Sequence, residues 1–175
     1  MTPGISVRVA GLDDLPTVVE LRLALLREYG DHELYRGLHP DAPRRAYDLY
    51  RAQLESNSES IFLAERGTHA VGILRCVDTP GSPLLLPDRF CYVSSVYVRP
   101  ALRRHGVLRM LLDAAEGWCA DRGLTEMRLH NAAAASIAAR TWGDLGFDVV
   151  EEVRRRVIES GRTAHATASA PANAY

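Results

Sequence analysis

Residues 98–112 read Val-Arg-Pro-Ala-Leu-Arg-Arg-His-Gly-Val-Leu-Arg-Met-Leu-Leu, and they contain the most distinctive local pattern of the sequence. A strand ends before Pro100, a short basic loop follows, and apolar residues at helical spacing begin near His105. Gly106 permits a tight turn and lets a ligand approach the backbone closely. The free N–H groups of the first helical turn, at the positive end of the helix, point at this loop. The loop is therefore a candidate site for a phosphate or pyrophosphate.

The same stretch is strongly basic. Between Arg89 and Leu112 the sequence has no carboxylate and five arginines, which are Arg89, Arg99, Arg103, Arg104 and Arg109. Arginine in this number suits an anionic ligand. One glycine is a weak phosphate-loop signal by itself, so a solvated basic turn that binds nothing is the alternative interpretation.

Upstream of this stretch, short strands and helices follow one another. The apolar spacing predicts a strand over 5–9, a helix from Asp13 or Asp14 to Gly30, a polar loop over 30–41 and a second helix from Asp41 to Leu54. A hairpin of strands 60–65 and 70–77, a long loop over 78–89 and a strand over 90–98 are predicted to follow. Arg22 is the one exception in the apolar stripe of the first helix.

Downstream, the alternation continues. The pattern predicts a helix from about His105 to Asp121, a strand over 125–130, a helix that Asn131 can cap and that runs to about Asp144, and a strand over 147–158. The last residues are small and polar without periodicity, which is typical of a flexible segment. We therefore expect one α/β domain over 1–160 and a flexible tail over 161–175.

The composition narrows the possible functions. A formal net charge of −1 argues against general binding to nucleic acids or anionic membranes. No apolar run approaches the roughly 18 residues of a membrane span, so we expect a cytoplasmic protein. All 21 basic residues are arginine, and together with the many alanines this favours a GC-rich bacterial source. Cys76, Cys91 and Cys119 are widely spaced, which predicts buried reduced thiols and no metal site.

Two motifs resemble those of a known family. Arg103-x-x-Gly106-x-Leu108 resembles the Gln/Arg-x-x-Gly-x-Gly/Ala signature of the GNAT superfamily of acyl-CoA-dependent N-acetyltransferases, and residues 96–100 are similar to its fourth strand and the following turn. Ala138-x-x-x-Trp142-x-x-Leu145-Gly146-Phe147 resembles the family's second motif. The order of predicted elements matches the family from residue 5 to about 158.

The resemblance implies a fold and a cofactor site. The expected fold is a mixed, strongly twisted sheet of six to seven strands with helices on both faces, in which the fourth and fifth strands splay apart around acetyl-CoA. The Val96 N–H would polarise the acetyl carbonyl, as an oxyanion donor does. The residues implied in cofactor binding are Val96, Tyr97, Val98, Arg103, Arg104, His105, Gly106, Val107, Leu108, Arg109, Asn131 and Trp142.

Three positions depart from the family pattern. Leu108 stands in place of a small residue, and its fit to the apolar stripe of its helix predicts that it faces the core. Ala135 stands in place of the usual asparagine. Trp142 stands in place of a tyrosine often proposed to protonate the CoA thiolate, and an indole N–H is not a usable acid. That role falls to another group or to water, or it is not needed, because a thiolate leaves readily.

The strand that carries a carboxylate in many family members has Tyr92 and Ser94 at the matching positions. A substrate ammonium must still lose a proton before it attacks. A water chain is one possible route, and the candidate residues are Glu28, Asp31, His32, Glu33 and His130. An ordinary surface histidine is the alternative interpretation of His130. The acidic residues 28–33 could equally bind a cationic substrate or form a solvated turn.

These observations predict an N-acetyltransferase that moves the acetyl group of acetyl-CoA to a primary amine of a small molecule. The amine attacks directly, without a covalent enzyme intermediate and without a metal. An acetyltransferase acting on protein N-termini or lysines is one alternative, and an acyl-CoA-binding module without catalysis is another. A homodimer is possible, because dimers are common in the family.

Overall fold

A computed structural model describes residues 4–131 and 136–158. The expected tail over 161–175 and the expected departure at Ala135 lie outside the described residues. The chain order is β1 (Ile5–Val9), η1 (Leu12–Asp14), α1 (Leu15–Glu28), α2 (Ala42–Leu54), β2 (Glu59–Arg66), β3 (His69–Pro80), β4 (Arg89–Val98), η2 (Pro100–Leu102), α3 (Val107–Ala120), β5 (Met127–Leu129) and α4 (Ser136–Asp144). The predicted elements up to β5 are confirmed, with shifts of a few residues at their ends.

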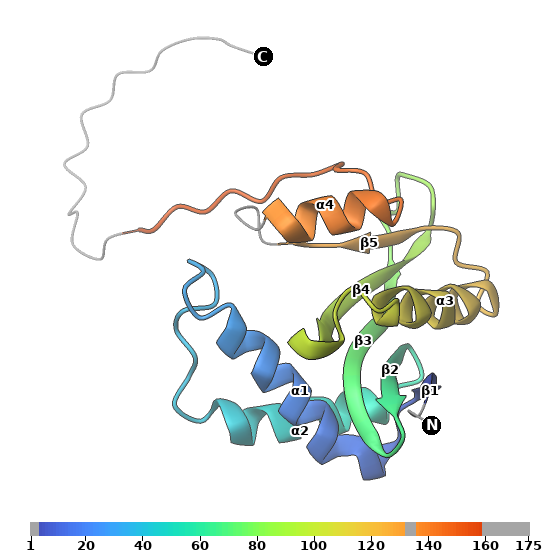
Figure 1. The fold of residues 1–175 in the computed structure, drawn as a ribbon. Coiled ribbons are helices and arrows are strands. Elements are labelled where there is room, and N and C mark those ends of the chain that lie inside the picture. The colour runs from blue at the N-terminus through green and yellow to red at the C-terminus, as the bar shows by residue number, and fades with distance from the viewer. Residues whose placement is uncertain (1–3, 132–135, 159–175) are drawn as a thin grey trace.

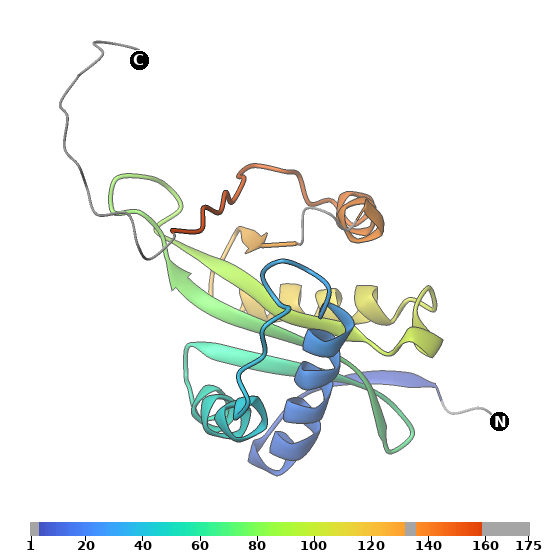
Figure 2. The same ribbon diagram turned by 90° about the vertical axis from the view of Figure 1, so that its left-hand side faces the viewer.

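The strands form one mixed sheet in the order β1-β2-β3-β4-β5. Each neighbouring pair from β1 to β4 is antiparallel, while β5 runs parallel to β4. Helices α1 and α2 cover one face of the sheet and α3 covers the other (Figures 1 and 2). The α/β class, the mixed sheet and the helices on both faces are therefore as the sequence predicts.

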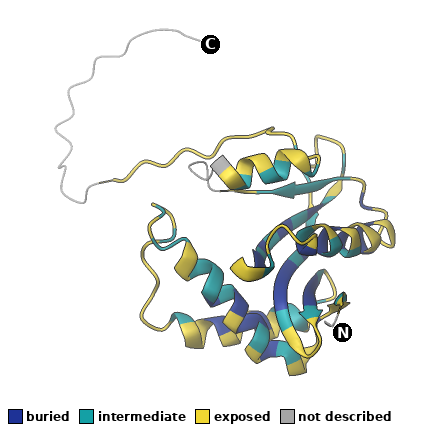
Figure 3. Ribbon diagram, in the orientation of Figure 1, coloured by how far each residue is buried: buried dark blue, intermediate teal, exposed yellow. Residues whose placement is uncertain are grey.

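Two apolar cores hold these layers together, one on each face of the sheet (Figure 3). On the α3 face, Leu111 and Val107 pack with strand residues such as Leu74. On the α1/α2 face, Leu21 packs with Ile73 and other strand residues. Burial of such side chains is the main favourable term in folding, at about 1.5–3 kcal/mol for each one.

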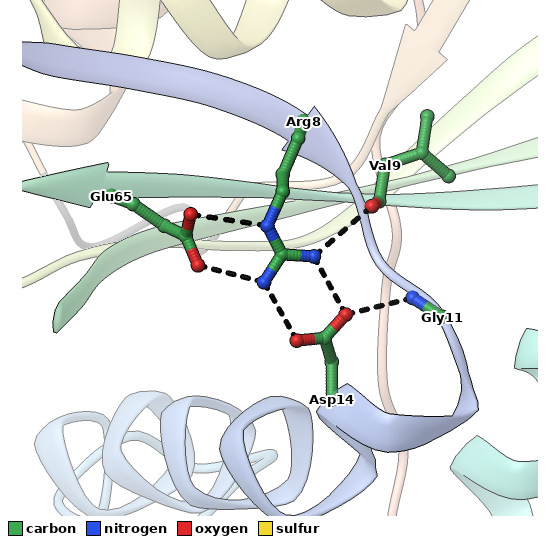
Figure 4. Close-up of polar contacts among 5 residues, drawn as sticks. All are labelled: Arg8, Val9, Gly11, Asp14 and Glu65. Carbon is green, nitrogen blue, oxygen red and sulfur yellow. Dashed lines mark hydrogen bonds and ion pairs between the residues drawn. The ribbon is translucent and has the colours of Figure 1, made fainter. Parts of the chain in front are cut away.

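An arginine fixes the start of the chain to the sheet. The Arg8 guanidinium donates to both carboxylate oxygens of Glu65 on β2 and to both of Asp14 beside α1, at 2.7–3.0 Å (Figure 4). Asp14 also accepts a hydrogen bond of 2.8 Å from the Gly11 N–H. The hydrogen bonds from Arg8 lower the pKa of Asp14, although burial opposes them. This contact joins β1, β2 and the first helix.

The strand expected over 147–158 does not form, so the described part of the sheet has five strands instead of six to seven. A cavity of about 740 Å³, lined by Leu129 on one side and Val149 on the other, separates the segment from β5. The β-branched residues of the segment favour extended backbone, but a strand also needs an edge within hydrogen-bonding reach. Val149 and Val150 are accordingly 87% and 85% exposed.

The three cysteines are free and buried, as predicted. Burial is the main cause that raises the pKa of Cys119 to about 12, and contact with Cys76 raises that of Cys91. The raised pKa values of Cys91 and Cys119 favour their protonated forms at neutral pH. No helix within residues 4–131 and 136–158 is long and apolar enough to span a membrane. The same residues contain no group of three or more potential metal ligands.

Candidate active site

Strands β4 and β5 separate halfway along β4. Their pairing covers Cys91↔Met127 to Val93↔Leu129 only, and β4 then continues alone on this side to Val98. The two strands diverge from this point in Figure 1. A cavity of about 190 Å³ opens here, between this half of β4, the end of β5 and helix α1. The splay implied by the family resemblance is therefore present.

A bulge in β4 shapes the wall of this cavity. Ile73 pairs with Tyr97 and Arg75 pairs with Ser94, so one β3 residue faces two on β4. Ser95 has a φ of 53°, which is rare for a residue other than glycine. Its hydroxyl is hydrogen-bonded to the buried Tyr50 hydroxyl at 3.0 Å, which helps to hold the strained backbone.

The bulge changes the direction of the side chains that follow it. Before the bulge, Val93 packs in the core on the α3 face; after it, Tyr97 packs in the core on the α1/α2 face. Bulges of this kind re-aim residues at functional sites. Val96 follows the strained residue directly and lines the cavity.

The loop before α3 has the backbone form that a phosphate cradle needs. Arg104 and Gly106 both have positive φ, at 62° and 79°. A Cβ built on Gly106 would meet no atom within 4 Å, so the space next to it is open. Gly106 is the N-cap of α3, and no side chain caps this end of the helix. The first N–H groups of α3 are therefore left for a ligand.

Three of the five arginines between Arg89 and Leu112 are engaged elsewhere, and Arg89 lies at the far end of β4 from this loop. Arg89 pairs with Asp78, and Arg99 pairs with Glu20 at 2.8 Å. Arg103 donates to the Val98 carbonyl at 2.9 Å and to Glu28 at 2.6 Å, so it braces the end of β4 against α1.

The other two arginines supply the positive charge at the loop. Arg104 and Arg109 are exposed and have no carboxylate partner within the described chain. His105 lies between them, and its Nδ1 is 2.7 Å from the Arg103 carbonyl oxygen.

Leu108 and Trp142 take part in packing. Both lie against the core on the α3 face, so Leu108 faces inward as expected. The ring of Trp142 meets that of Phe147 edge to face at 5.3 Å and also lines the cavity. Asn131 lines the cavity as well, and the first described residue of α4 is Ser136, so the expectation that Asn131 caps this helix falls on residues outside the described ones.

The proposed base candidates are not brought together. Glu28 is paired with Arg103, and Glu33 is paired with Arg36 and Arg155. Neither glutamate lines the cavity. His32 Nδ1 accepts the Leu34 N–H at 3.2 Å in the loop after α1.

His130 is the candidate that does reach the cavity. It follows β5 directly, and its Nδ1 is 2.9 Å from the Tyr92 hydroxyl oxygen. Both side chains line the cavity. Burial is the main cause that raises the pKa of Tyr92, so this phenol is neutral at pH 7. The pair places one imidazole nitrogen against a tyrosine and leaves the other, Nε2, for a substrate.

Sequence reasoning missed several residues that line the cavity. The sequence marks Tyr92 only as a position without a carboxylate and gives no sign of its contact with His130. Arg22, Tyr29 and Tyr35 also line the cavity. The sequence distinguishes Arg22, because this residue interrupts the apolar stripe of α1. Nothing in the sequence distinguishes Tyr29 and Tyr35 in this way.

Solved structures share this fold. A GCN5-related N-acetyltransferase from Ralstonia eutropha JMP134 is 24% identical, with 88% of this chain and 99% of that chain covered and a TM-score of 0.71. A predicted acetyltransferase with acetyl-CoA from Clostridium acetobutylicum is 18% identical, with 87% and 96% covered and a TM-score of 0.71. An aminoglycoside antibiotic 6′-N-acetyltransferase from Acinetobacter haemolyticus is 22% identical, with 89% and 99% covered and a TM-score of 0.70.

One of the two sequence comparisons gives a match. Curated protein sequences give none. The family model described as the acetyltransferase (GNAT) family matches residues 23–147, which is more than half of the chain. This range contains the splayed strands, the uncapped helix end and the open glycine loop. The chain therefore belongs to the GNAT family of acetyltransferases.

Proposed function

We propose that this acetyltransferase moves the acetyl group of acetyl-CoA to the primary amine of a small molecule by direct attack. The observation that carries the proposal is the open, uncapped loop at Gly106 next to the end of the splayed strand. The backbone N–H groups of residues 104–108 would hold the diphosphate, with Arg104 and Arg109 adding charge. Backbone groups of Val96 and Val98 would pair with the pantetheine arm. The Val98 carbonyl already accepts one bond from Arg103, and a carbonyl oxygen can accept two.

The size of the cavity favours a small acceptor. Its volume of about 190 Å³ is below the roughly 300–1,000 Å³ of pockets for drug-sized ligands. The reacting acetyl group must share this space with the amine. A small molecule fits, whereas a protein N-terminus or lysine side chain would have to reach the same space from outside.

In the proposed reaction the amine nitrogen bonds to the acetyl carbon, the carbon–sulfur bond breaks, and CoA leaves as a thiolate. The Val96 N–H would stabilise the charge on the carbonyl oxygen. The Nε2 atom of His130 would accept the proton of the amine, with its Nδ1–H donating to the Tyr92 oxygen. The protonated thiols of Cys91 and Cys119 support a reaction without a covalent enzyme intermediate.

The test combines a binding measurement with a turnover measurement. Acetyl-CoA at 100 times its Kd should raise the free energy of unfolding by about 2.7 kcal/mol. CoA release should then be measured over a panel of small amines, an N-terminal peptide and a lysine peptide. Release with small amines is the expected result. Release with peptides alone would favour a protein acetyltransferase, and binding without release would favour a module that only binds acyl-CoA.

A further inference from the structure

The cavity between β4, β5 and α1, called the acceptor cavity from here on, is lined within the described residues by permanent positive charge but not by negative charge. Among the described residues that line it, Arg22 is the only one with a permanent charge, and none is an aspartate or glutamate. Three tyrosines, Tyr29, Tyr35 and Tyr92, supply much of the remaining polar surface. A cavity with this lining does not attract an acceptor that carries several positive charges.

Arg22 occupies an unusual position. It is half-buried on α1, near Leu25 and Leu26 in the cavity wall. Its charge is close enough to Tyr92 to oppose the rise in the pKa of that phenol. An arginine in an apolar wall is costly unless an anion accompanies it.

Within residues 4–131 and 136–158, no carboxylate fills this role. The carboxylates on the same helix are paired elsewhere, Glu20 with Arg99 and Glu28 with Arg103. No hydrogen bond or ion pair from residues 4–131 or 136–158 reaches the Arg22 guanidinium. By contrast, Arg8 and Arg75 each form an ion pair with a glutamate. A planar guanidinium binds a carboxylate through two parallel hydrogen bonds, which makes a carboxylate the best-matched ligand.

We propose that the acceptor is an amino acid, whose carboxylate binds Arg22 while its amine faces His130 and the thioester. This inference rests on the proposed function and names its substrate class. It also predicts that polycationic amines such as aminoglycosides are poor acceptors for this protein. In this respect the protein would differ from the aminoglycoside antibiotic 6′-N-acetyltransferase of Acinetobacter haemolyticus. None of the three acidic residues in 28–33 lines the cavity, and Glu28 and Glu33 are in ion pairs, which argues against a cationic subsite there.

The test compares each of the standard amino acids with the amine left by removal of its carboxylate, for example phenylalanine with phenethylamine. Loss of a charge-assisted hydrogen bond costs about 1.5–3 kcal/mol, or roughly 10- to 100-fold. We expect the wild type to acetylate at least one amino acid with a kcat/KM higher by this factor than its decarboxylated partner. Arg22→Gln should abolish the difference mainly through KM, and Arg22→Lys should restore part of it.

Arg27→Gln is the matched control, because Arg27 lies on the same helix, is exposed and does not line the cavity. It should keep the full preference, and all variants should keep the wild-type affinity for acetyl-CoA. Equal turnover of amino acids and decarboxylated amines would overturn the inference and leave the proposed function standing.

A second readout separates the two proposals if no acceptor is turned over. Calorimetric titration of the CoA complex with each amino acid measures binding without chemistry. Binding that Arg22→Gln abolishes and Arg22→Lys partly restores would support the carboxylate site although the proposed function failed. Absence of any Arg22-dependent binding would overturn the inference.

Discussion

The cofactor loop and the acceptor cavity lie at the same splayed strands but are built differently. The loop before α3 presents backbone N–H groups, and its form depends on the left-handed conformation of Gly106. The cavity presents side chains from α1, the following loop, β4, β5 and α4. A backbone site binds what all family members share, whereas a side-chain site can change with each sequence. Changes at the loop should therefore affect every substrate, and changes in the cavity should affect only the acceptor.

The largest expected effect is at the loop. Gly106→Trp should weaken acetyl-CoA binding by roughly 100-fold or more, because it places a bulky side chain in the open space and strains a left-handed residue. Calorimetric titration with acetyl-CoA measures this loss. Gly123→Trp is the matched control, since Gly123 also has positive φ with open space beside it but lies at the other end of α3. Equal losses in both variants would show that backbone strain, and not the blocked loop, is the cause.

The next largest effect is in the cavity. His130→Gln should lower kcat by about 100-fold, because the general base is lost, and should leave acetyl-CoA binding unchanged. Glu28→Gln should change kcat less than about 3-fold, because Glu28 is paired with Arg103 outside the cavity. A loss of activity in the glutamate variant alone would reverse these two roles.

A change outside both regions should affect stability alone. Asp14→Asn should lower the free energy of unfolding at pH 7 by about 1 kcal/mol, after allowance for the exposure of Arg8. Because Arg8 lowers the pKa of Asp14, its contribution is present above about pH 3.9 and is lost as the pH falls further. Denaturant unfolding at pH 7 and pH 3 measures the effect, and the gap between wild type and variant should be smaller at pH 3 than at pH 7. Asp13→Asn, next to it and exposed, should show no comparable gap.

The smallest expected effect is at Trp142, which borders the cavity but packs against the core. Trp142→Phe should change kcat less than about 3-fold and cost some stability. Steady-state kinetics with the best acceptor measures this. A loss of 100-fold in kcat with the fold intact would show that the indole N–H takes part in catalysis.

The difference between the two regions also explains what the sequence could predict. The pattern that predicts the loop lies within one short stretch of sequence. A strand end, a glycine and the start of an apolar helix all fall within residues 98–112. The cavity brings together residues between Arg22 and Trp142, and only the fold decides which of them meet. The pairing of Tyr92 with His130 therefore had no local signal. Arg22 had one, because a charged residue in an apolar stripe needs an explanation.

Two further features show the limits of local patterns. The segment 147–158 has the composition of a strand but pairs with no strand of the described sheet, and a cavity lies between part of it and β5. The bulge at Ser95 had no signal, because a positive φ at a serine depends on the contact with Tyr50 from another element. In both cases the tertiary arrangement overrides local preference.

A crystal structure of the acetyl-CoA complex would show whether backbone amides of residues 104–108 bind the diphosphate. Diphosphate oxygens should lie about 3 Å from these nitrogens, with the thioester carbonyl next to the Val96 N–H in the gap between β4 and β5. Cofactor density at any other place on the protein would rule out this binding site.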